Sequence, residues 1–154
     1  MPGYGIWGPT EGRGVLPWSW AEERLASSHR YWVASVGPAG QPHAMPVWGV
    51  WLTGSLWFST GGRSRKARNL EADPRCVVHI EDGAEPVVVE GTAQPLRDAA
   101  VLGEVLAAYE EKYAERPPEV AENPIFRVRP RRAFGLIESA DEFAASATRW
   151  DFDG

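Results

Sequence analysis

The chain has 154 residues, a formal net charge of −5 and 44% apolar residues. This length predicts one domain, and the acidic balance argues against a nucleic-acid or anionic-membrane partner. Cys76 is the single cysteine, which excludes an internal disulfide or a cysteine-based zinc site. No apolar run approaches the roughly 20 residues that span a bilayer, and no basic start precedes an apolar segment. We therefore expect a cytoplasmic protein.

The first 18 residues are expected to form an irregular N-terminal arm. Residues 1–17 contain five glycines and three prolines without helical or alternating periodicity. A single domain is expected to follow over residues 19–154. Its first element is a predicted helix over residues 19–28, with Ser19 as N-cap and Glu22 completing a capping box.

Three strands are predicted next, over residues 31–36, 41–52 and 55–60, with a tight turn at Thr53-Gly54. The second is apolar on both faces and contains Pro42 and Pro46. Proline cannot donate to a sheet ladder, so this strand should lie at an edge, carry a bulge or face a ligand.

Further strands are predicted over residues 75–80, 85–93, 125–128 and 133–138. Asp98 should cap a helix that runs to about Tyr113 with apolar residues at helical spacing. Two or three helices among several short strands predict a mainly β fold, a small antiparallel barrel.

A short helix after Ser64 carries its charges at the unfavourable ends. Ser64 is a good N-cap, and Ala67 and Leu70 share a face. Arg63, Arg65, Lys66 and Arg68 crowd the positive N-terminal end, against the helix dipole. These cations could form a solvated basic face. Because a bound anion would reverse the penalty, we favour a phosphate site.

Four segments follow one another at a characteristic spacing: residues 40–48 (GQPHAMPVW), 58–60 (FST), 64–70 (SRKARNL, then Pro74) and 87–91 (VVVEG). Together they resemble the pyridoxamine 5′-phosphate oxidase-like, flavin-binding split barrels. Residues 109–113 (YEEKY) and 148–150 (TRW) are similar to the flavin- and deazaflavin-dependent reductase subgroup of that superfamily.

The resemblance implies an antiparallel split barrel of six to eight strands, forming a homodimer with cofactor sites at the subunit interface. Arg65 and Lys66 would hold the cofactor phosphate. Hydroxyl or backbone donors to it would come from Ser59, Thr60 and Ser64. The isoalloxazine ring and its ribityl chain would run beside His43, Ala44, Met45, Pro46, Val47 and Trp48. Trp150 would contact the ring from the other subunit.

The implied cofactor is FMN, with coenzyme F420 as the alternative. The implied reaction passes hydride between that cofactor and a small unsaturated or conjugated acceptor. His43 stands where the best-known family member has arginine, and that enzyme's substrate-phosphate residues have no clear counterpart near this C-terminus. Oxidation of pyridoxamine phosphate itself is therefore not expected.

Several alternatives remain open at the level of sequence. The chain could be a non-catalytic flavin- or haem-binding module, and His43 could be a structural residue at the barrel rim. The eight tryptophans are better explained by packing than by ligand contact. His29, His43 and His79 lack metal-ligand spacing, so no metal is expected. No residue stands out as a catalytic acid.

Overall fold

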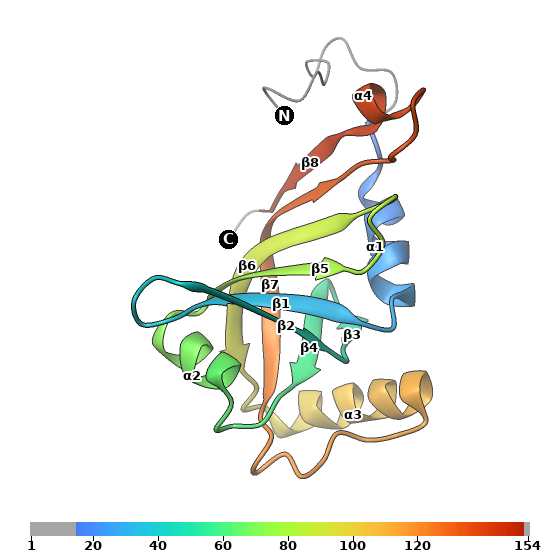
Figure 1. Ribbon diagram of the computed structural model, residues 1–154. Helices are drawn as coiled ribbons and strands as arrows, with labels where there is room; N and C mark the ends of the chain where they lie inside the picture. Colours follow the sequence, from blue (N-terminus) through green and yellow to red (C-terminus); the bar gives the residue numbers. More distant parts are fainter. Residues whose placement is uncertain (1–14, 153–154) are drawn as a thin grey trace.

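The computed structural model describes residues 15–152; residues 1–14 of the expected arm and residues 153–154 lie outside it (Figure 1). The described part contains eight strands and four helices. The strands are β1 (Tyr31–Val36), β2 (Pro42–Val47), β3 (Val50–Leu52), β4 (Ser55–Ser59), β5 (Arg75–Ile80), β6 (Val87–Pro95), β7 (Ile125–Gly135) and β8 (Thr148–Asp151). The helices are α1 (Trp18–Ser27), α2 (Arg65–Ala72), α3 (Ala99–Tyr113) and α4 (Phe143–Ser146).

The strands form one antiparallel sheet in the order β2-β1-β5-β6-β7-β4-β3, with β8 paired to the far part of β7. β2 and β3 are the two ends of this order, yet only Trp48 and Gly49 separate them in the chain. Seven flat strands would span roughly 29 Å at about 4.8 Å per spacing. Three Cα steps from Val47 to Val50 reach at most about 11 Å. The sheet must therefore curl until its two edges approach, which is the expected split barrel.

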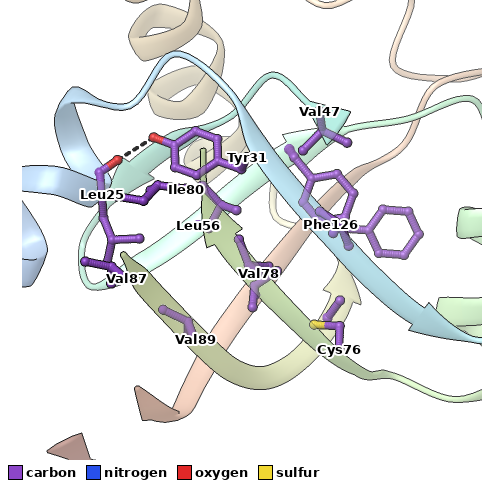
Figure 2. Packing of buried hydrophobic residues seen from close by; sticks show 14 of the residues in the cluster. Leu25, Tyr31, Val47, Leu56, Cys76, Val78, Ile80, Val87, Val89 and Phe126 are labelled. Atoms are coloured by element: carbon purple, nitrogen blue, oxygen red, sulfur yellow. Dashed lines mark hydrogen bonds between the residues drawn. The ribbon is translucent and has the colours of Figure 1, made fainter. Parts of the chain in front are cut away.

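The core fills the inside of this curl. Burial alternates strictly along β1, where Tyr31, Val33 and Ser35 point inward. Figure 2 shows Val78, Val89 and Phe126 converging from three other strands. The Tyr31 hydroxyl donates to the Leu25 carbonyl, which joins α1 to β1 (Figure 2).

A second, smaller cluster lies under α3. Val105 and Tyr109 of the helix pack with Val50, Trp57 and Ile125. This confirms the apolar face predicted for the helix, and the Asp98 side chain caps it by accepting from the Ala100 amide at 2.9 Å. None of the helices in residues 15–152 is both long and apolar enough to cross a membrane.

The predicted bounds of the second strand and the predicted cap of the first helix are wrong. The predicted strand over residues 41–52 is two strands, because the chain leaves one sheet edge at Val47 and joins the other at Val50. α1 begins at Trp18 with Pro17 as N-cap and no side-chain cap. Ser19 is therefore not the cap, and the Glu22 carboxylate instead accepts from the Trp51 indole at 3.3 Å.

Two further predictions near the C-terminus are wrong. Residues 125–128 and 133–135 belong to one strand, β7, which continues through Pro130 and ends at Gly135, so residues 136–138 lie outside it. The proline is tolerated because the register shifts beside it, between Glu90 and Gly91 on β6. The described chain also has one helix more than expected, the single-turn α4.

Gly91 lies at the register shift between β6 and β7. A Cβ placed on Gly91 would meet the Arg129 carbonyl oxygen at 2.2 Å. That contact is with backbone, which cannot rotate away, so only glycine fits without moving one of the two longest strands.

We expect Gly91→Ala to lower the free energy of unfolding by about 1–3 kcal/mol, the usual cost of overpacking. Urea denaturation followed by tryptophan fluorescence measures the change. Gly103→Ala is the matched control, because a Cβ there meets nothing within 4 Å and α3 gains about 0.5–1 kcal/mol from the exchange. Equal stability of Gly91→Ala and wild type would contradict the assignment of the bulge.

Candidate functional site

The N-terminus of α2 presents donors and cations in one place. The Ser64 hydroxyl accepts from the Ala67 amide at 3.1 Å, which confirms the predicted N-cap. No acidic residue lies in the first turn of α2 and no basic residue in the last. The dipole penalty predicted from the sequence is thus present in the fold.

Lys66 is the most unusual residue of this helix. It is only 7% exposed, and its Nζ lies 5.9 Å from the centroid of the Phe58 ring. Burial lowers the pKa of its amine below the ordinary lysine value. Within residues 15–152, the ion pairs join other side chains and none involves Lys66. A buried cation without a counterion is costly unless a ligand supplies the charge.

Arg65 and His43 meet in a pocket of about 650 Å³ between the β1–β2 turn and α2. We call this the β2–α2 pocket. Arg68 and Asn69 also line it, whereas Lys66 does not and lies on the inner side of the helix. Consecutive helical residues project about 100° apart, so Arg65 and Lys66 point to different sides of α2, and contact of both with one anion stays a prediction.

The charge in the β2–α2 pocket is positive. Its one carboxylate, Asp73, is paired with Arg75 at 2.6 Å, and hydrogen bonds from Arg75 lower the pKa of Asp73 to about 2. Arg65 and Arg68 have no such partner among the described residues. The buried Nδ1 of His43 has no hydrogen-bond partner either. The pocket therefore offers the side chains of Arg65 and Arg68 to an anionic ligand.

The predicted hydroxyl donors lie beside this helix but already have partners within the chain. The Ser59 hydroxyl donates to the Asn123 carbonyl at 3.1 Å, and the Thr60 and Ser64 hydroxyls are 3.3 Å apart. The Thr60 amide donates to the Pro124 carbonyl at 3.3 Å. These groups shape the loop before α2, and their donation to a phosphate stays a prediction.

β2 forms an open edge of the sheet, as its two prolines suggested. Ala44, Met45 and Pro46 are exposed, and Met45 reaches 49% exposure, high for a large apolar side chain. Val47 differs, because it is 8% exposed and belongs to the core. Of the residues predicted to run beside the ring, Val47 alone turns its side chain into the barrel core.

Trp48 directly follows β2 in the chain. Its ring stacks on Tyr113 with centroids 4.5 Å apart and planes inclined by 2°, and the residue remains 45% exposed. The stacked Trp48–Tyr113 pair therefore lies at the connection between β2 and β3, and part of its apolar surface is open to solvent.

Trp150 lies elsewhere in the same chain. On β8 it packs against Trp18, with ring centroids 5.4 Å apart, and its indole donates to the Leu16 carbonyl at 3.2 Å. It is not among the residues that line the β2–α2 pocket. Figure 1 draws β8 and α2 at separate ends of the sheet. A ring contact from Trp150 therefore needs a second subunit and stays a prediction.

Sequence reasoning did not identify Asn69 or the polar end of α3. Asn69 is 3% exposed and donates to the Ser35 hydroxyl at 3.1 Å, which ties α2 to β1. A signal was present, because Asn69 and Leu70 follow Lys66 at the i+3 and i+4 spacing of one helix face. Tyr109, Lys112 and Tyr113 were assigned only to packing or resemblance, although each bonds to backbone near Trp48 or Gly49.

No group of three or more His, Cys, Asp or Glu side chains gathers as a metal site within residues 15–152. Cys76 is buried, and burial raises the pKa of its thiol to about 12, so it remains protonated at neutral pH.

Several solved structures share this fold. The conserved hypothetical protein Rv2991 from Mycobacterium tuberculosis is 25% identical, with a TM-score of 0.67 over 92% of this chain and 89% of its own. A protein described as an F420 reductase is 24% identical, with a TM-score of 0.57 over 73% of this chain and 94% of its own. HutZ, a heme storage protein from Vibrio cholerae, is 19% identical, with a TM-score of 0.66 over 77% and 94%. No curated protein sequence matches the chain.

The family comparison covers most of the barrel. A family model described as pyridoxamine 5′-phosphate oxidase matches residues 20–137, from α1 through β7. That span contains β2, α2 and the cationic pocket between them. This chain therefore belongs to the pyridoxamine 5′-phosphate oxidase family and has its split-barrel fold.

Proposed function

We propose that this protein is an oxidoreductase that binds FMN or coenzyme F420, with the cofactor phosphate at the N-terminus of α2. Lys66 is the observation that carries the proposal. Its side chain is only 7% exposed, lacks a carboxylate partner among the described residues, and belongs to the first turn of α2, where the helix dipole attracts an anion. A phosphate is the ligand group that would offset this cost.

The neighbouring surface supports a flat cofactor. Arg65 and His43 line the β2–α2 pocket at the proposed phosphate end. From there, β2 leads along exposed Ala44, Met45 and Pro46 to the half-exposed ring of Trp48. A cationic group at one end and apolar surface at the other match the phosphate and ring of a flavin or deazaflavin.

In the proposed reaction the residues bind and orient. When bound, the reduced cofactor supplies a hydride to an unsaturated or conjugated acceptor. Arg65 offers a planar fork to phosphate oxygens, and Lys66 a compact charge. Pro46 has no N–H group, so a ring can cover it without burying an unpaired donor. No side chain is assigned as a proton donor.

A homodimer belongs to the same proposal. The exposed apolar residues of β2 would then be covered by a second copy, which would also bring Trp150 toward the ring. A cytoplasmic location and a small-molecule substrate complete the proposal.

A non-catalytic module that stores or senses haem is the second candidate, favoured by the likeness to HutZ. Titration of the purified protein with FMN, F420 and haemin separates the two. We expect binding of FMN or F420 at micromolar concentration and a weaker, non-saturating response to haemin. Saturable haemin binding with no response to either flavin would instead support the storage module.

We expect the double variant Arg65→Ala/Lys66→Met to lose FMN affinity by roughly ten- to 150-fold per contact removed, because each charge-assisted bond contributes about 1.5–3 kcal/mol. Isothermal titration calorimetry measures this loss. Riboflavin, which lacks the phosphate, should bind wild type and variant equally. An equal loss for both ligands would place the phosphate elsewhere.

The matched control is Arg116→Ala, which removes an exposed cation paired with Glu110 in the loop after α3. It should leave FMN affinity unchanged. Lys66→Met should not destabilise the free protein, because a buried charge without a partner is replaced by an apolar side chain of similar volume. A stable variant with weak binding excludes unfolding as the cause.

The lowered pKa of Lys66 also predicts a pH dependence. The phosphate attracts the protonated amine, so FMN affinity should fall as the pH rises and the free amine loses its proton, at a pH below that of an ordinary lysine. Binding should take up protons where the free amine titrates, which calorimetry in buffers of different ionisation enthalpy detects. An FMN affinity that increases as the pH rises, or one that changes in parallel with riboflavin, would contradict a role for Lys66.

A further inference from the structure

The connection between β2 and β3 is held from one side by the end of α3. Trp48 and Gly49 lie between the two edges of the sheet and outside either strand. Their peptide groups consequently need partners from another element. Three side chains near the C-terminal end of α3 provide them: Tyr109, Lys112 and Tyr113.

Each of the three makes a distinct contact with this connection. The Tyr109 hydroxyl donates to the Trp48 carbonyl at 2.9 Å and accepts from the Ser59 amide at 3.1 Å. The Gly49 amide donates to the Tyr113 hydroxyl at 3.0 Å. The Lys112 Nζ donates to the Gly49 carbonyl at 2.9 Å. These bonds give partners to the Trp48 carbonyl and to both peptide groups of Gly49, and they fix the position of the connection.

Lys112 also joins the connection to the core strand β1. Its Nζ donates to the Tyr31 hydroxyl at 2.8 Å, and Tyr31 is fully buried. The same amine lies 4.8 Å from the Tyr31 ring centroid and 5.4 Å from that of Tyr113. Burial lowers the pKa of Lys112 to about 8. A half-buried amine with two acceptors and two rings around it has little freedom to move.

The orientation of the Trp48 ring follows from these contacts. Tyr113 covers one face of the Trp48 ring in a nearly parallel stack, and Lys112 lies against the Tyr113 ring. We infer that Lys112 is a positioning residue, which holds Tyr113 and through it sets the Trp48 ring at the angle needed to stack with the ring of the cofactor. This inference rests on the proposed flavin or deazaflavin binding and adds the residues that orient its ring end.

The role is distinct from that of Lys66. Lys66 is proposed to contact the phosphate, so its loss should weaken FMN and spare riboflavin. Lys112 acts on the ring end, which FMN and riboflavin share. Its loss should therefore weaken both ligands by the same factor.

The test uses the full chain labelled with 5-fluorotryptophan. The Trp48 signal in the fluorine NMR spectrum is assigned with Trp48→Phe. In Lys112→Met we expect that signal to shift or broaden while the signals of tryptophans distant from α3 stay in place. Affinity for FMN and for riboflavin should fall together by about tenfold, equivalent to about 1.4 kcal/mol. Lys112→Arg, which retains donors and charge, should restore part of both.

Two further variants keep the test decisive. Glu104→Gln, at an exposed position on α3, should change neither the Trp48 signal nor either affinity. Tyr113→Phe keeps the stacked ring and removes the hydroxyl bond to Gly49, so it should reproduce the effect of Lys112→Met in a milder form. If Lys112→Met does not fold, the Trp48 signal and the two ligand affinities are measured in Tyr113→Phe instead.

The outcomes separate the two levels of the proposal. Unchanged flavin affinity in a folded Lys112→Met protein would overturn the positioning role alone. So would a loss confined to FMN. Failure of wild type to bind FMN, F420 or riboflavin would overturn the proposed function and this inference with it.

Discussion

The rest of the structure depends on the short link formed by Trp48 and Gly49. This link joins β2 and β3, the two ends of the sheet order, and forces the seven-strand path to curl around a core. It cannot close the barrel, because β2 and β3 do not pair with one another. Because the two edge strands of the curled sheet do not pair with each other, an opening remains between them. The exposed ring of Trp48 stands at that opening because it belongs to the link.

Two helices, α2 and α3, differ in what they contribute to the proposed site. α2 brings cationic side chains whose charge is not balanced within the described chain, among them buried Lys66. α3 brings hydroxyl groups and an amine that satisfy the peptide groups of the link. Neither Lys66 nor Lys112 has a carboxylate partner in residues 15–152, but the Lys112 amine donates to the Tyr31 hydroxyl and the Gly49 carbonyl. Ligand binding is expected at α2, and mechanical support at α3.

Local sequence signals correctly predicted those features that a single local rule determines, such as a helix cap or a tight turn. Ser64 and Asp98 cap helices as expected, and the Thr53-Gly54 turn joins two strands. The break at Trp48 was missed, although Gly49 interrupts the apolar run between Val47 and Leu52 and an isolated glycine in a strand pattern can mark such a break. Its position depends on the pairing of distant strands. At the site, the cations were found from charge placement, but the burial of Lys66 and the contacts of Lys112 depend on tertiary packing that no local pattern encodes.

Lys66 and Lys112 are the only two lysines in the chain, and its other cationic side chains are arginines. Both amines are largely shielded from solvent by the fold, and both have lowered pKa values. Enzymes that acetylate or ubiquitinate proteins attack lysine amines and do not act on guanidinium groups. Apart from the chain's α-amino group, this protein consequently offers such enzymes no freely exposed amine. An acyl group attached to Lys66 would lie at the proposed phosphate end of the ligand site, and one attached to Lys112 would lie near the proposed ring end. Lysine modification would therefore affect ligand binding, because the chain has no lysine elsewhere on its surface.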